Sequence, residues 1–307
     1  MPASPVPLFS NYLIVDWSAA AAPKTGVDSI WYGWLERHAD GRWTYEDSNP
    51  DTRTKAMAEI RARLVKAMKQ SRATLAGFDF PFGYPLGAAA RFSREAEQPW
   101  RGVWKTLTRH VFDGDENANN RFAAAGRMNR MMGGKGGPFW GRPANGDGFE
   151  GLTARKPAAD AHGLPEMRIA DSWQAGPQSP WKLYGIGSVG GQQLVGLPRL
   201  WRLREDPELA PHSKVWPFET GLAAPFGARA AQPRIVFAEV WPSLARWQPY
   251  VRDGQVKDQA QVRALAEHLA KLDQAGRLAR LFVGPRGLNR EQCEAVEREE
   301  GWILGVL

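Results

Sequence analysis

Cysteine is nearly absent from this sequence: Cys293 is the single cysteine among 307 residues. One thiol excludes an internal disulfide framework and is typical of a reducing compartment. The sequence also lacks any run of about 18 apolar residues, the length that a membrane-spanning helix needs. Residues 1–7 contain neither the basic region nor the apolar stretch of a secretion signal. We therefore expect a cytoplasmic protein that has no membrane partner.

Histidine is scarce as well, and two common kinds of catalytic site are missing. The five histidines are scattered without paired spacing, which argues against a zinc site. Ser188 lacks the glycine two positions earlier that a nucleophile elbow requires, so serine hydrolysis is not expected. Any catalytic chemistry must therefore come from other side chains.

The overall composition is that of a large globular domain with a basic surface. Hydrophobic residues make up 43% of the chain, enough for a sizeable core. The formal net charge is +7 and the pI is near 9.6. This excess favours an anionic partner, either nucleic acid or a phosphorylated small molecule, although a basic surface that only contacts solvent has the same composition.

The first 83 residues show the pattern of an α/β domain. Short runs rich in strand-forming residues predict three strands that form an antiparallel meander, at 12–16, 29–35 and 42–45. Met57, Ile60, Leu64 and Met68 recur at helical spacing and predict a helix over 54–71. The apolar run 73–78 then predicts a fourth strand, which breakers end at Pro81 and Gly83.

A long middle segment, 84–232, has little sustained periodicity. It is rich in Gly, Pro, Trp and Arg, and short helices are expected only at 88–97, 104–112 and 121–132. Its many tryptophans argue against disorder, because disordered segments are poor in aromatic residues. Regular structure resumes with a predicted strand at 234–240 and helices at 258–274 and 289–300. We therefore predict one domain, 1–307, whose core is 10–83 and 233–307 and whose partly irregular insertion is 84–232.

Acidic residues stand where three of the predicted strands end. These residues are Asp16, Asp79 and Glu239, and Asp258 stands at the start of a nearby helix. Carboxylates gathered at one edge of a sheet repel each other, and Mg²⁺ or Mn²⁺ commonly resolves that repulsion because hard cations prefer oxygen ligands. Structural roles remain open for each acid: Asp16 as a turn cap, Asp258 as a helix N-cap, and Glu239 as the partner of an arginine.

Four segments around these acids resemble a known family. They are Ile14-Val15-Asp16-Trp17-Ser18, Gly77-Phe78-Asp79-Phe80-Pro81-Phe82-Gly83, Ala238-Glu239-Val240-Trp241-Pro242-Ser243 and Glu299-Glu300-Gly301-Trp302-Ile303-Leu304-Gly305. With Ser188-Val189-Gly190-Gly191-Gln192 in the middle of the chain, they are similar to an uncharacterised bacterial family of predicted ribonuclease H-like nucleases.

The resemblance implies a ribonuclease H-like mixed sheet flanked by helices. In that superfamily the acid of the first strand, the acid of the fourth strand and a later helical acid bind the metals, which implies Asp16, Asp79 and Asp258 here. Glu239 is an additional acid, and we include it among the predicted catalytic and metal-binding residues. Trp17 and the Phe80-Pro81-Phe82 wall crowd the site, so a single strand or a small phosphoester suits it better than a duplex.

Glycine-rich segments supply candidates for substrate binding. Gly185 to Gly190 matches the dinucleotide-binding fingerprint, but no clear strand precedes it and Pro198 is expected to interrupt any following helix. We interpret it as a turn whose backbone amides hold a phosphate, and Gly133 to Gly137 as a hinge. The candidate substrate-binding residues are Ser18, Lys135, Lys182, Ser188, Gly190, Gly191 and Gln192.

Three functions fit the sequence, and a metal-dependent phosphodiesterase or nuclease is the leading one. Two bound cations can activate water and stabilise a leaving oxygen without a nucleophilic side chain. The first alternative is an actin-like or sugar-kinase-like ATP phosphotransferase, which would need glycine where Trp17 stands. The second is a non-catalytic nucleic-acid-binding module whose acids are structural. The sequence does not distinguish DNA, RNA, a nucleotide or a small phosphoester as the substrate.

Overall fold

The amino-terminal half of the sheet is the predicted antiparallel meander. The computed structural model describes residues 6–93, 95, 97–133, 136–143, 149–158, 162–225 and 234–307. Strand β1 (Asn11–Asp16) pairs antiparallel with β2 (Trp31–Arg37), which pairs in turn with β3 (Trp43–Ser48). The breaks predicted between these strands are confirmed.

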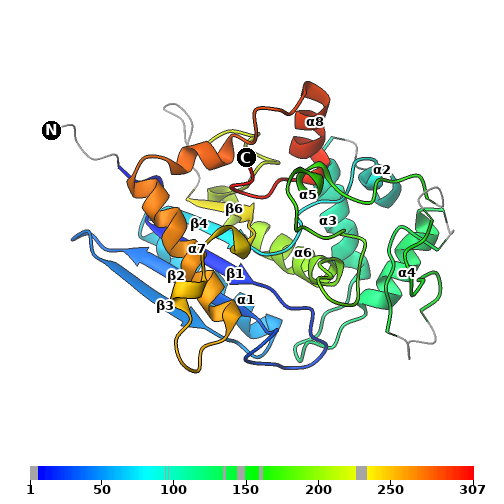
Figure 1. The fold of residues 1–307 in the computed structure, drawn as a ribbon, viewed down its shortest axis with the longest axis horizontal. Coiled ribbons are helices and arrows are strands. Elements are labelled where there is room, and N and C mark those ends of the chain that lie inside the picture. Colours follow the sequence, from blue (N-terminus) through cyan, green and yellow to red (C-terminus); the bar gives the residue numbers. More distant parts are fainter. Residues whose placement is uncertain are drawn as a thin grey trace.

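The other half of the sheet is parallel. Strand β4 (Thr74–Phe78) lies beside β1, β6 (Ile235–Glu239) lies beside β4, and β5 (Ser213–Val215) forms the outer edge. The strand order is β3-β2-β1-β4-β6-β5, with flanking helices (Figure 1). This is a ribonuclease H-like topology, and the fold class expected from the sequence is confirmed.

Helices cover both faces of the sheet, and each face has its own hydrophobic core. Helix α7 (Lys257–Gln274), orange in Figure 1, packs its apolar stripe on the face that carries Ile14, Leu75 and Val236. The opposite face carries Leu13, Val15, Phe78 and Phe237. Helices α1 (Arg53–Lys69), α3 (Pro99–His110) and α6 (Gly190–Arg204) pack there. Successive side chains of a strand point to opposite faces, so each acid at a strand end belongs to one face only.

Segment 84–232 contributes directly to the core. It contains α2 (Ala88–Phe92), α3, α4 (Arg121–Met131), α5 (Ile169–Trp173), α6 and the edge strand β5. The chain ends with α8 (Arg290–Ala295) and a π-helical turn (Val296–Glu300). Single 3₁₀ turns lie at Ala210–His212, Pro242–Leu244, Gln248–Tyr250 and Leu278–Phe282.

Helix α6 corrects the expectation that Pro198 would interrupt a helix after the glycine-rich turn. Pro198 lies inside the helix, and residues on every side of α6 are buried. Gly196 lets the helix approach the sheet, because a Cβ there would lie 2.7 Å from the Phe80 ring. A helix buried all round has no polar stripe, so its sequence shows no helical periodicity.

Half of the fourteen tryptophans, and many of their aromatic neighbours, are buried inside the molecule. Trp181 stacks on Tyr84 with ring centroids 4.7 Å apart, and Trp104 donates its indole N–H to the Phe82 carbonyl at 2.7 Å. Trp100 stacks on Phe218 at 5.0 Å. These contacts explain why an aperiodic segment is ordered: aromatic packing holds it against the core.

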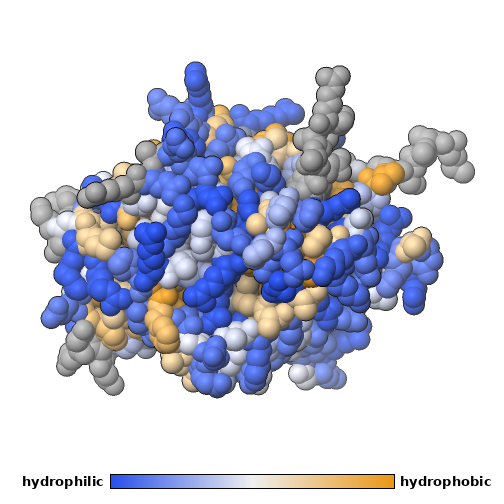
Figure 2. Space-filling model, turned by 180° about the vertical axis from the view of Figure 1, so that it is seen from behind, coloured by the Kyte–Doolittle hydropathy of each residue, from blue (hydrophilic) through white to orange (hydrophobic). Residues whose placement is uncertain are grey.

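The surface seen in Figure 2 is mainly hydrophilic, with hydrophobic residues in small separate groups. Within the described ranges, none of the helices combines the length and the apolar character that crossing a bilayer requires.

Candidate functional site

The register of the sheet places Asp16 and Asp79 side by side. Val15 of β1 pairs with Phe78 of β4, and the Asp79 N–H donates to the Val15 carbonyl at 2.9 Å. Asp16 and Asp79 are therefore the next neighbours in register. Ile14 points toward α7, so Asp16 two residues later points to the same face, and Asp79 points there beside it.

Gly77, two residues before Asp79, lies where a larger side chain has no room. A Cβ on Gly77 would lie 2.6 Å from Cγ1 of Val240 and 3.1 Å from Cδ1 of Ile14. These two side chains close over Gly77 from the neighbouring strands. Gly77 therefore allows the side chains of Ile14 and Val240 to pack closely beside the end of β4.

Asp258 lies on α7, the helix that covers the face toward which Asp16 and Asp79 point. It is the second residue of α7, and its Oδ2 accepts a hydrogen bond from the Asp28 N–H at 3.0 Å. The expectation that Asp258 stands in the first helical turn is confirmed. It approaches the strand ends because α7 covers the face toward which Asp16 and Asp79 point.

Burial and neighbouring carboxylates raise the pKa values of Asp16 and Asp79. Burial, followed by the negative charges of Asp79 and Asp258, raises the pKa of Asp16 well above its usual value. Burial, followed by the charges of Glu239 and Asp258, raises the pKa of Asp79 from 3.8 to about 7. Lys257 lowers both pKa values but does not offset these effects. Beyond the larger effect of burial, Asp16 is therefore harder to ionise because Asp79 and Asp258 are near, and Asp79 is harder to ionise because Glu239 and Asp258 are near.

Asp16 and Asp79 differ from most buried acids in having no protein partner. Both are half-buried, yet neither carboxylate receives a hydrogen bond or ion pair from the described part of the chain. Within that part, no group of three or more His, Cys, Asp or Glu side chains is assembled closely enough to hold a metal ion. The arrangement is thus a pair of unpartnered carboxylates with a third acid near by.

Glu239, the fourth predicted ligand, belongs to a different environment. It pairs in register with Phe78, one residue before Asp79, so its side chain points to the opposite face. Arg168 binds it through two nitrogens, at 2.7 Å to Oε2 and 2.6 Å to Oε1. Both side chains are buried. Both of its oxygens therefore have partners in the protein, and the role of Glu239 as a metal ligand stays a prediction.

Arg168 is the centre of a buried network. It also binds both Asp171 oxygens, at 2.7 and 2.9 Å, and the Glu300 carbonyl at 3.0 Å. Burial favours the neutral guanidine, but the carboxylates of Asp171 and Glu239 hold the pKa of Arg168 well above its usual value. Glu239 in turn accepts the Phe82 N–H at 2.9 Å, which fixes the wall that follows Asp79.

The loop after Asp16 is anchored from two sides. Arg53, fully buried, donates to the carbonyls of Ser18 and Ala20 at 3.0 and 2.8 Å. Gln192, in the first turn of α6, donates to the Trp17 carbonyl at 2.6 Å. The Ser18 hydroxyl contacts the Asp28 carbonyl at 3.2 Å and accepts from the Ala20 N–H. Ser18 therefore shapes this loop, and Gln192 is a predicted substrate-binding residue that lines a cavity together with Asp79.

The structure also describes most of the remaining candidates for substrate binding, whose role stays a prediction. Lys182 donates its ammonium to the Ile186 carbonyl at 2.7 Å. Gly190 and Gly191 are buried at the start of α6, where a Cβ on Gly190 would lie 2.4 Å from the Pro180 carbonyl. Ser188 lies in the turn before α6. Lys135 lies outside the described residues.

A small cavity opens beside Asp79. Its volume is about 210 Å³, and it lies between the ends of β4 and β6, the segment 176–178 and the start of α6. Asp79, Gln192 and Trp241 line it, and the Arg168 network forms part of its wall. The acids are therefore next to a space that a small group can enter.

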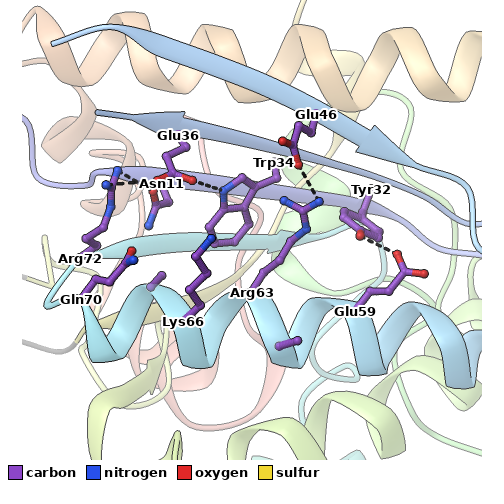
Figure 3. A pocket seen from close by; sticks show the side chains of 12 residues that line it. Asn11, Tyr32, Trp34, Glu36, Glu46, Glu59, Arg63, Lys66, Gln70 and Arg72 are labelled. Carbon is purple, nitrogen blue, oxygen red and sulfur yellow. Dashed lines mark hydrogen bonds and ion pairs between the residues drawn. The ribbon is translucent and has the colours of Figure 1, made fainter. Parts of the chain in front are cut away.

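A larger groove of about 510 Å³ lies elsewhere, between α1 and the strands β2 and β3 (Figure 3). Its charges are paired: Glu36 with Arg72 at 3.1 Å and Glu46 with Arg63 at 2.8 Å. The Tyr32 hydroxyl donates to Glu59 at 2.6 Å. We interpret this groove as a solvent-filled space between α1 and the sheet, which long charged side chains span.

Three residues of the site region were missed by sequence reasoning: Arg53, Arg168 and Asp171. Each acts through tertiary contacts, and Arg168 and Asp171 lie in the aperiodic segment. The sequence held one sign of Arg168: Glu239 stands in an apolar strand, and a buried carboxylate requires a cationic partner.

Known proteins do not place this chain in a family. No protein-family model matches it, and no match was found among curated proteins or solved structures.

Proposed function

We propose that this protein is a divalent-metal-dependent phosphodiesterase that acts on nucleic acid or a small phosphoester. The observation that supports this proposal is the pair of unpartnered carboxylates, Asp16 and Asp79, on one face at the ends of neighbouring parallel strands. Proteins rarely leave such groups without partners, because ionising them side by side in a partly buried place is unfavourable. Unpaired acids of this kind mark functional sites.

The donor set fits Mg²⁺ or Mn²⁺. Mg²⁺ keeps several waters and is commonly bound through one or two carboxylates together with substrate phosphates, rather than by a complete protein cage. Two carboxylates without a third therefore meet its requirement, and the third acid, Asp258, remains near. When bound, such a cation would neutralise the acids and polarise a phosphate oxygen or a water.

Residues around Asp16 and Asp79 would hold these two carboxylates in position for the reaction. Asp16 is held by the strand and by the anchored loop after it, and Asp79 by the wall that Glu239 fixes through Phe82. In hydrolysis, a water oxygen forms a bond to phosphorus, the phosphorus–oxygen ester bond breaks, and the leaving oxygen departs as an alcohol that carries the proton lost by the water. Asp258 assists by adding negative charge that favours cation binding, and Lys257 beside it offers a positive charge to the phosphate.

The alternative ATP phosphotransferase is not favoured by the geometry. Trp17, which follows Asp16, is buried and packs its ring against Phe78 and Phe80 with centroids 6.5 and 5.8 Å apart. Those folds require glycine at this place so that the backbone approaches a phosphate. Here an indole fills the core beneath the loop instead.

The proposal predicts Mn²⁺-dependent hydrolysis of a simple phosphodiester, bis(p-nitrophenyl) phosphate, and of short single-stranded oligonucleotides. Asp16→Asn and Asp79→Asn should each lower the rate at least about a hundredfold, because each removes a charge that the cation needs. Glu46→Gln, a change of the same kind in the α1 groove, serves as the matched control and should retain full activity. Wild-type protein with no hydrolysis, or Asp79→Asn protein with full activity, would contradict the proposal.

A further inference from the structure

The cavity beside Asp79 has the size and chemistry of a subsite for one unpaired nucleobase. We propose that it receives the base of a nucleotide whose phosphate lies at Asp16 and Asp79; this inference rests on the proposed function. The ligand is one nucleotide unit. Either a free nucleotide or the unpaired end of a nucleic-acid strand can supply it.

The size of the cavity restricts its occupant to a small group. At about 210 Å³ it falls below the roughly 300 to 1,000 Å³ of pockets that enclose drug-sized ligands. A base pair cannot enter it, whereas a single base can, as in enzymes that take one base out of the stack. Phe80, Pro81 and the segment 176–178 are part of its lining.

The charge of the lining excludes a phosphate from the interior. Apart from Asp79, which the proposed function assigns to the cation, one basic residue and two acidic residues line the cavity: Arg168, Asp171 and Glu239. All five N–H donors of Arg168 are engaged by Asp171, Glu239 and the Glu300 carbonyl. No donor of this arginine remains for an anion, and the net charge is negative. A neutral group fits inside, and its phosphate must lie outside, toward the unpartnered acids.

The remaining lining suits a flat, polar-edged group. Trp241 is half-buried, and Gly176 packs against its edge, since a Cβ on Gly176 would lie 2.6 Å from Cη2 of the indole. The indole is therefore held in place before any ligand binds. Gln192 uses its Nε2 on the Trp17 carbonyl, which leaves its Oε1 as an acceptor, and Gln178 is exposed at the rim. Aromatic stacking combined with amides is the usual means of holding an unpaired base.

The test compares ligands with and without a base. Binding of uridine and adenosine 5′-monophosphates and of ribose 5-phosphate is measured by calorimetry in Mn²⁺. The nucleotides should bind at least about tenfold more tightly, as expected for one stacked base. Trp241→Leu should abolish the tighter binding of the nucleotides relative to ribose 5-phosphate. Gln178→Ala, a change at an exposed position that preserves folding, should lower that affinity ratio about threefold. Trp201→Leu is the matched control, because Trp201 does not line the cavity.

The outcomes separate this inference from the proposed function. Ribose 5-phosphate that binds as tightly as the nucleotides, or wild-type base preference in both Trp241→Leu and Gln178→Ala, would overturn the base subsite even if Mn²⁺-dependent hydrolysis is observed. Base-dependent binding without hydrolysis would support the subsite and overturn the phosphodiesterase.

The source of the nucleotide is tested with a labelled oligonucleotide, single-stranded or in a blunt duplex, by fluorescence anisotropy at 4 °C. Tight binding of the single strand alone identifies an unpaired strand end, and binding of mononucleotides alone identifies a free nucleotide. Preferential binding of the blunt duplex would overturn the subsite.

Discussion

The groove beside α1 and the sheet edge at Asp79 both gather carboxylates, but they treat them in opposite ways. In the groove, Glu36, Glu46 and Glu59 each have a partner within 3.1 Å (Figure 3). At the sheet edge, Asp16 and Asp79 have none in the described chain, and their pKa values are raised. The groove is the larger hollow. Unsatisfied charge, rather than the size of a hollow, therefore indicates where chemistry is to be sought.

The same contrast occurs within the site, between residues one register position apart. Glu239 and Asp79 end neighbouring strands, but Glu239 points to the Arg168 side and Asp79 toward α7. The first acid is satisfied by the protein and the second is not. Glu239 thus has a buried cationic partner, whereas the proposed chemistry rests on Asp16 and Asp79.

The largest expected effect on stability comes from the network in which the carboxylates are paired, that of Arg168. Arg168→Met leaves Asp171 and Glu239 buried without a cation and should cost about 3 to 5 kcal/mol of unfolding free energy. Urea denaturation measures the loss. Adding Glu239→Gln and Asp171→Asn to the same chain should restore much of it, because the uncompensated charges are gone. A loss below about 1 kcal/mol for Arg168→Met would show that the network is not a structural centre.

Asp79→Asn should have a smaller effect of opposite sign. Because the pKa of Asp79 rises from 3.8 to about 7 on folding, the native state binds the proton more tightly, and stability falls as pH rises through this window. Removing the charge should stabilise the protein by on the order of 1 to 3 kcal/mol at pH 8. The gain should vanish near pH 4. Urea denaturation of both proteins at pH 8 and pH 4 measures this difference. If Asp79→Asn is less stable than the wild type at pH 8, the conclusion that Asp79 has no partner is wrong.

Glu46→Gln should have the smallest effect. Its pair with Arg63 is largely exposed, and such pairs contribute less than about 1 kcal/mol. The same denaturation series should show no more than this change at either pH. A pH-dependent gain equal to that of Asp79→Asn would remove the difference between groove and site.

The sequence predicted the regular core and part of the site. Strands β1 to β4 and β6 and helices α1 and α7 follow from apolar periodicity, and the acids that end β1 and β4 follow from the same strands. The face to which Glu239 points could not be predicted, because a shift of one residue in register reverses it. Helix α6 was missed because it is buried all round and contains Pro198, and β5 because three residues carry no periodicity. Arg168 was missed because its role exists only in three dimensions.

Titration of Mn²⁺ into the protein by calorimetry tests the central claim most directly. Wild-type and Glu46→Gln proteins should bind Mn²⁺ with equal affinity, and Asp16→Asn and Asp79→Asn should each weaken binding at least about tenfold, since Mn²⁺ requires the charged oxygens. Equal Mn²⁺ binding by the wild-type and Asp79→Asn proteins would contradict the assignment of the unpartnered carboxylates as the metal site.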